Sequence, residues 1–128
     1  MSGEIKLELE KIIWVYENEN IVEIYFDEIF IIGEYTIDSI FDDWFIVFVS
    51  RDGSWEKISM FAENIDLLLN ALSDKYNIEV GQTQLANSTK WNSIISFPNS
   101  IRGKKLFNLV KNKIELDEDI KEYFLPKR

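Results

Sequence analysis

Residues 44–50, which read WFIVFVS, constrain the fold more than any other segment of the chain. Their six consecutive apolar residues place apolar side chains on both faces of a strand, so that strand has to be covered on both sides. Asp52-Gly53 follows at once and is a strong hairpin signal, because glycine tolerates the positive φ of a tight turn. We therefore expect a central strand over 44–50 that returns antiparallel through 54–61.

Other segments have the alternation or the β-branched and aromatic content of strands. They are 5–9, 12–16, 21–26 and 91–97. The polar run at 17–20 predicts a turn that joins two of them into a hairpin. Residues 29–40 fit either a strand or a buried helix, with a break at Gly33.

Three segments favour helices. Residues 64–76 carry one apolar stripe, with Asn64 as the expected N-cap and Asn77 as a left-handed stop. A basic helix is expected over 100–112 and a short final helix over 117–125. The chain is therefore predicted to be a single α+β domain over 1–128. We expect a mainly antiparallel sheet of about five strands packed against two or three helices.

The missing residue types narrow the chemistry. There is no cysteine and no histidine, so disulfides, thiolate sites and histidine-based catalysis are excluded, and no cofactor or metal is expected. No phosphate loop, nucleophile elbow or zinc motif occurs, so we do not expect an enzyme. A carboxylate-based, metal-dependent enzyme stays open as an alternative, because Asp38, Asp42 and Asp43 would meet at helical spacing.

The location of the protein follows from two absences. The first ten residues have no apolar core of a signal peptide. The longest apolar run is six residues, far below the roughly 20 that span a bilayer. A soluble, cytoplasmic protein without membrane contact is expected.

Charge is distributed unevenly along the chain. Residues 1–79 hold 18 acidic and 5 basic residues, a net charge of −13, whereas residues 80–128 hold 5 acidic and 9 basic residues, a net charge of +4. The two sum to the −9 of the whole chain. Between Lys11 and Arg51 there is no basic residue but there are nine carboxylates. Solubility does not require such an exclusion, and unrelieved like charge costs stability, so a binding function is indicated.

Clustered carboxylates attract a basic partner and speed its approach, while aromatic side chains add contact area. Tyr35 is expected to be exposed as an aromatic anchor. The predicted partner-binding residues are Glu23, Asp27, Glu28, Glu34, Tyr35, Asp38, Asp42 and Asp43.

The acidic run from Glu17 to Asp43, in a short chain without cysteine, histidine or catalytic motif, resembles the bacterial immunity proteins of toxin–immunity systems, including those of contact-dependent inhibition. The resemblance is one of type and carries no residue-level roles. It implies an inhibitor that neutralises a basic protein, with a nuclease toxin as the leading candidate. An acidic adaptor or nucleic-acid mimic is the alternative.

The basic residues near the C-terminus allow several interpretations. They are Arg102, Lys104, Lys105, Lys111 and Lys113, with Lys127 and Arg128 in the tail. A solvated helix face is the simplest. A second contact with the partner, or a head-to-tail dimer, stays open, so the oligomeric state is not determined. Direct binding of nucleic acid is not expected, because a chain of net charge −9 repels a polyanion.

Overall fold

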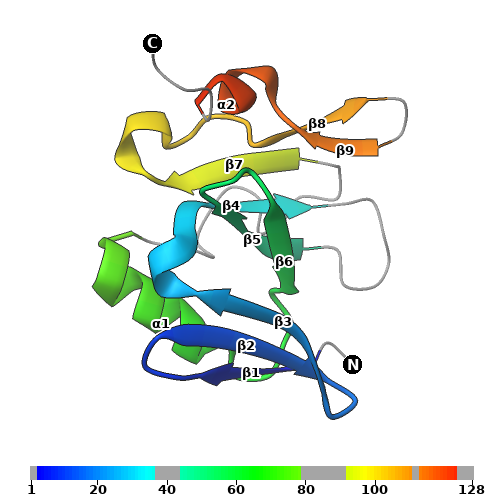
Figure 1. Cartoon of the computed structure of the whole chain (residues 1–128), viewed down its shortest axis with the longest axis vertical. Coiled ribbons are helices and arrows are strands. Elements are labelled where there is room, and N and C mark those ends of the chain that lie inside the picture. Colours follow the sequence, from blue (N-terminus) through cyan, green and yellow to red (C-terminus); the bar gives the residue numbers. More distant parts are fainter. Residues whose placement is uncertain (1–2, 37–43, 79–91, 111–112, 124–128) are drawn as a thin grey trace.

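The strand expected over 44–50 lies inside a four-stranded sheet. The computed structural model describes residues 3–36, 44–78, 92–110 and 113–123 (Figure 1). In this sheet β5 (Trp44–Ser50) lies between β4 (Ile29–Thr36) and β6 (Trp55–Ser59), and β7 (Asn92–Phe97) pairs with the other side of β4. All three pairings are antiparallel. The hairpin predicted at Asp52-Gly53 is confirmed, and residues 29–36 are resolved as strand.

Side chains of β5 alternate between two separate cores. Ile46 and Phe48 belong to one core, and Phe45, Val47 and Val49 belong to the other. Strand geometry dictates this, because successive side chains point to opposite faces of a sheet. Both faces of the central sheet therefore need a covering layer, as the apolar run predicts.

The N-terminal layer covers the first face. It consists of a three-stranded antiparallel sheet, β1 (Glu4–Leu7), β2 (Lys11–Tyr16) and β3 (Glu19–Tyr25), together with α1 (Ile65–Tyr76). These elements lie in the lower part of Figure 1. A short 3₁₀ turn, η1 (Phe26–Glu28), leads from this layer into β4. Its core residues include Ile5, Ile12, Val22, Ile24, Leu68 and Leu72.

The C-terminal layer covers the second face and lies at the top of Figure 1. It contains η3 (Asn99–Ile101), the hairpin of β8 (Phe107–Val110) and β9 (Lys113–Leu116), and α2 (Glu118–Tyr123). Its core residues include Tyr35, Ile95, Leu106, Phe107 and Ile120.

The basic helix predicted over 100–112 is wrong. Gly103, at a φ of 86°, and its neighbours form an exposed turn, and β8 follows. The hydroxyl of Ser93 on β7 accepts hydrogen bonds from the backbone N–H groups of Leu106 and Phe107, at 3.1 and 3.0 Å. These bonds hold the segment extended against β7. The pair of large apolar residues therefore enters the core from a strand and the turn before it, not from a helix face.

The predicted class is confirmed in its coarse form. The described residues form mostly antiparallel sheet, with two short helices of which only α1 exceeds six residues. The strands form three sheets instead of a single sheet of about five. None of the described helices is long and apolar enough to cross a membrane.

Of the two capping predictions for α1, the one at its C-terminal end is confirmed and the one at its N-terminal end is wrong. Asn77 adopts the left-handed conformation, at φ 55°, and its N–H bonds to the carbonyl of Ser73, so the predicted stop is confirmed. Asn64 makes no side-chain cap, so the predicted N-cap is wrong. Its amide nitrogen instead lies 3.4 Å from both Glu4 Oε2 and the carbonyl oxygen of Ile5, and thereby links α1 to β1.

Candidate functional site

Two of the predicted contact residues, Glu34 and Tyr35, lie inside the protein. Glu34 is fully buried, and the indole nitrogen of Trp44 donates a hydrogen bond of 2.9 Å to its carboxyl group. β4 is an inner strand with both faces covered, so a polar side chain on it is buried together with its neighbours. Glu34 therefore cannot contact a partner in this fold.

Tyr35 was expected to be exposed, and this prediction is wrong. Only 1% of its surface is exposed, and its ring packs against Phe45, Phe107 and Trp55 at centroid distances of 5.2, 5.4 and 6.5 Å. Burial raises the pKa of Tyr35 to about 12. The residue is a core aromatic of the C-terminal layer.

The remaining predicted residues divide into two groups. Glu23 on β3 and Asp27 and Glu28 in η1 are exposed. The other three, Asp38, Asp42 and Asp43, lie outside the described residues. The alternative of a metal site built on these three aspartates therefore also lies outside them.

The exposed acids near η1 surround a lysine at one end of the three-stranded sheet. We call this region the Lys11 end; it comprises Glu8, Leu9, Glu10, Lys11, Glu23, Tyr25 and Asp27. Two small hollows of about 320 and 270 Å³ occur here, both beside Leu9, which is 90% exposed. An exposed leucine with a neighbouring tyrosine would suit a contact surface.

Lys11 offsets much of the negative charge at this end. Its ammonium lies 2.8 Å from Glu23 and 3.9 Å from Glu8, and 5.5 Å from the ring centre of Tyr25. The hydrogen bond to Glu23 raises the pKa of Lys11 above its usual value. A second lysine, Lys75 of α1, lies 4.7 Å from the ring centre of Phe26. Glu8 and Glu23 at this end thus have a cation close by.

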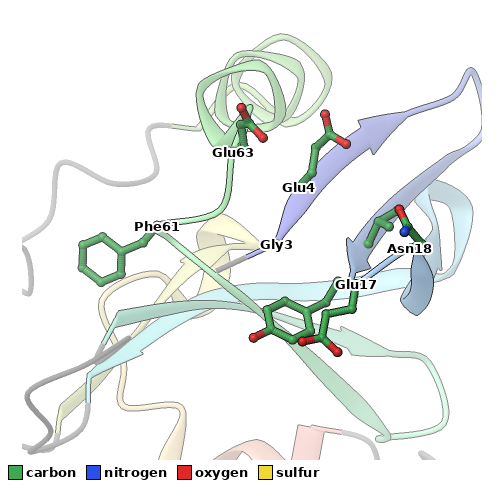
Figure 2. Close-up of a pocket in the computed structure, with 8 residues that line it drawn as sticks. Gly3, Glu4, Glu17, Asn18, Phe61 and Glu63 are labelled. Atoms are coloured by element: carbon green, nitrogen blue, oxygen red, sulfur yellow. The ribbon is translucent and has the colours of Figure 1, made fainter. Parts of the chain in front are cut away.

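The opposite end of the same sheet carries the larger hollow, of about 730 Å³. We call it the hairpin groove; it is lined by Gly3, Glu4, Val15, Tyr16, Glu17, Asn18, Phe61 and Glu63. Figure 2 shows Glu4 and Glu63 near each other, Glu17 and Asn18 on the far side of Gly3, and Phe61 at the outer margin. Three segments distant in sequence build it.

Backbone contacts hold these segments together. The N–H of Glu63 bonds to the carbonyl of Gly3, and the N–H of Ile5 bonds to the carbonyl of Glu63, both at 2.8 Å. Gly3 has a φ of 78°, and a Cβ there would lie 2.5 Å from Trp14 Nε1 and 2.6 Å from the carbonyl oxygen of Val15. Only glycine lets the first strand pass this close to the indole of Trp14.

The tip of the β2–β3 hairpin forms the other wall. Glu17 and Asn18 connect the paired residues Tyr16 and Glu19, and both have positive φ, 53° and 65°. Two-residue hairpin turns of type I′ need positive φ at both positions. Asparagine is common in that conformation, whereas glutamate is not, so Glu17 carries its carboxylate at a backbone cost.

Aromatic surface accompanies the carboxylates of the groove. Phe61 is 54% exposed, and its ring meets the Trp44 ring edge-on at 6.4 Å. Tyr16 is 37% exposed. The groove therefore offers apolar contact area beside its acidic groups.

The electrostatics of the groove differ from those of the Lys11 end. No lysine or arginine is among the described residues that line it. The ion pairs within the described part of the chain involve Lys11 and Lys121, and none includes Glu4, Glu17 or Glu63. In the same residues no three acidic groups lie close enough to hold one metal ion. Within the described residues the groove is acidic, free of ion pairs and partly aromatic.

Sequence reasoning missed most of this site. Glu17 is counted in the acidic run, but Glu4, Phe61 and Glu63 are outside it. A signal for Glu17 was present in the polar turn at 17–20. Nothing in the linear sequence brings residue 63 to residue 4, because that contact depends on the path from β6 into α1.

Comparison of the chain with protein-family models, with curated proteins and with solved structures found no match. The interpretation of the site therefore depends on its own geometry and charge.

Proposed function

We propose that the chain is a non-catalytic binding protein that neutralises a basic protein. The observation that carries the proposal is the charge of the N-terminal layer. Residues 3–36 hold nine carboxylates and two lysines. Of these carboxylates only Glu34 is buried, so the others present a negative field to solvent. A field of one sign steers a partner of the opposite sign and raises its rate of association.

The class of partner follows from the same charge. Proteins that act on nucleic acids carry basic surfaces, and an acidic protein can occupy such a surface. The resemblance in type to bacterial immunity proteins agrees with this direction. We therefore propose a bacterial nuclease toxin as the partner. The lack of cysteine favours the cytoplasm as the place of action.

Capture from a lysate of the source cell, followed by a toxicity test, examines this function. A tagged chain is incubated with the lysate at low and at high salt, and the bound proteins are identified by mass spectrometry. We expect one basic protein that is toxic when expressed alone and harmless when co-expressed with this chain. Capture of many DNA-binding proteins without rescue would instead support a nucleic-acid mimic.

Association kinetics with the captured protein provide the charge control. Glu17→Lys with Asp27→Lys changes one exposed acid at each end of the sheet and should slow association by about tenfold at low salt. Glu56→Lys with Glu118→Lys makes the same charge change on β6 and α2, outside the N-terminal layer, and should slow association much less. Equal effects of the two pairs would mean that total charge, and not the N-terminal layer, determines the rate.

A further inference from the structure

We infer that the hairpin groove docks an extended, arginine-bearing segment of the basic partner. The inference rests on the proposed function and adds to it the place of contact and the chemistry of the bound segment. The Lys11 end would then contribute to long-range attraction only.

Charge complementarity selects the groove over the rest of the acidic layer. Glu4, Glu17 and Glu63 line one hollow, and the described part of its lining contains no lysine or arginine. At the Lys11 end an incoming cation would have to displace Lys11 from Glu23, to which it is hydrogen-bonded at 2.8 Å. Among the described residues no carboxylate of the groove is ion-paired, and Glu4 accepts a long hydrogen bond of 3.4 Å from the Asn64 amide.

The dimensions of the groove favour a segment over a single ion. A hollow of about 730 Å³ is in the range of sites that enclose a ligand of many atoms. Its carboxylates come from three segments, and the described residues contain no group of three acids placed to share one metal ion. Cationic groups spaced along a chain can each meet a different carboxylate.

The aromatic wall favours arginine over lysine. A guanidinium stacks on an aromatic face and binds a carboxylate through two parallel hydrogen bonds. Phe61 and Tyr16 are exposed and line the same hollow as Glu63 and Glu17. An ammonium group gains less from such a surface because it is a compact, strongly hydrated charge.

Two tryptophans make the groove observable without a label. The indole of Trp14 adjoins Gly3, and the ring of Trp44 contacts Phe61. Trp55 packs on Phe107 at 4.7 Å, in the core on the other side of the central sheet. Occupation of the groove should therefore shift the indole N–H resonances of Trp14 and Trp44 and leave that of Trp55 in place.

The test uses a synthetic peptide of alternating arginine and serine, titrated into the full chain and followed by NMR. Counterparts with lysine or glutamate in place of arginine serve as controls. We expect the arginine peptide to bind most tightly, the lysine peptide several-fold more weakly, and the glutamate peptide not at all. Trp14→Phe assigns its indole resonance.

Matched variants locate the binding. Glu17→Gln with Glu63→Gln removes two groove charges with little change in shape, and should weaken peptide binding by about tenfold. Glu10→Gln with Asp27→Asn removes two charges at the Lys11 end, and should change it by less than about twofold. Phe61→Leu should reduce the preference for arginine over lysine.

Equal weakening by the two pairs, or shifts confined to Leu9 and Tyr25, would overturn the inference. The proposed function can fail separately. Peptide binding in the groove without rescue from any toxin would leave the docking site standing and remove the inhibitor role. If the groove variants still rescued cells from the toxin, the inhibitor role would stand and the docking site would be removed.

Discussion

The two ends of the three-stranded sheet carry similar acidic charge but arrange it differently. At the Lys11 end the carboxylates of Glu8 and Glu23 share one ammonium, and the hollows beside Leu9 are small, about 320 and 270 Å³. At the hairpin groove three carboxylates line a hollow of about 730 Å³ whose lining, as far as the structure describes it, contains no lysine or arginine. The strands are the same, so the difference arises in the turns and connections at their ends.

This difference teaches where a charge excess becomes a candidate site. Exposed ion pairs contribute little energy and hold their members in place, so a paired carboxylate is a weaker attractor than an unpaired one. A hollow adds contact area and excludes water around the bound group. Net charge indicates which layer of the protein binds a partner. Ion pairing of the carboxylates and the presence of a hollow indicate where in that layer the binding site lies.

Gly3→Ala should have the largest effect on stability and should act at the groove end. The added Cβ would clash with Trp14 and the Val15 carbonyl, so we expect a total loss of about 2 to 4 kcal/mol in the free energy of unfolding. Strain at positive φ alone would account for ~1 to 2 kcal/mol of it. Gly53→Ala is the control, because Gly53 has a φ of 89° with no atom within 4 Å of its Cβ position. Urea unfolding measures both, and equal losses would mean that the close approach to Trp14 is unimportant.

Trp44→Phe should have the next largest effect. It removes the indole N–H that donates to buried Glu34 and leaves a smaller ring in contact with Phe61. We therefore expect a loss of about 1 to 3 kcal/mol in the free energy of unfolding. Glu34→Gln keeps a carbonyl acceptor for the indole and should cost less. If the glutamine variant is the less stable of the two, the hydrogen bond is not what holds Trp44. The Lys11 end should keep its NMR spectrum in both variants.

Glu17→Asn should change stability and binding in opposite directions. Asparagine is better tolerated at positive φ, so we expect a gain of about 0.5 to 1 kcal/mol in unfolding free energy. The loss of a carboxylate should weaken the arginine peptide at the same time. Glu19→Asn, in the adjoining strand, should give no gain. If Glu17→Asn lowered both the unfolding free energy and the affinity for the arginine peptide, there would be no trade-off at this turn.

Lys11→Met should have the smallest effect on stability at neutral pH, because the ion pairs of Lys11 are exposed. It should nevertheless make the two ends more alike, since Glu8 and Glu23 lose their cation. Weak arginine-peptide shifts should then appear at Tyr25. If they do not, pairing is not what separates the two ends.

The same variant has a defined dependence on pH. The pKa of Lys11 is raised in the folded state above the ordinary value of 10.5. Its contribution to stability is therefore complete below 10.5 and is lost as the pH rises through the folded-state pKa. In urea unfolding at rising alkaline pH, the wild type should lose the contribution of Lys11 to its unfolding free energy. Lys11→Met should show no such loss.

Part of the fold was predictable because the pattern allowed one solution. The apolar run of β5 requires cover on both faces, and the stripe of α1 together with Asn77 fixes a helix and its end. The segment 100–112 failed because adjacent large residues, Leu106 and Phe107, suit a strand as well as a helix face. In the extended form the N–H of Leu106 donates to the hydroxyl of Ser93, thirteen residues away, and no local pattern reveals that contact.

The site was less predictable than the fold. Local charge identified the acidic layer, but Glu34 and Tyr35 occur in a strand whose neighbours on both sides are distant in sequence. Their burial depends on β5 and β7, which no local pattern of 29–40 reveals. The hairpin groove likewise needs residues near positions 4, 17 and 63 to meet, and that meeting is a property of topology.

The way the groove is built has a consequence for how the protein can diverge. Its outer carboxylates, Glu17 and Glu63, are carried by a tight turn and by a connection, and both side chains are exposed. Changes at these positions can therefore alter which partner is recognised while both cores stay intact. Within a lineage, we expect the hairpin tip and the segment around residue 63 to vary quickly and β5 to vary slowly.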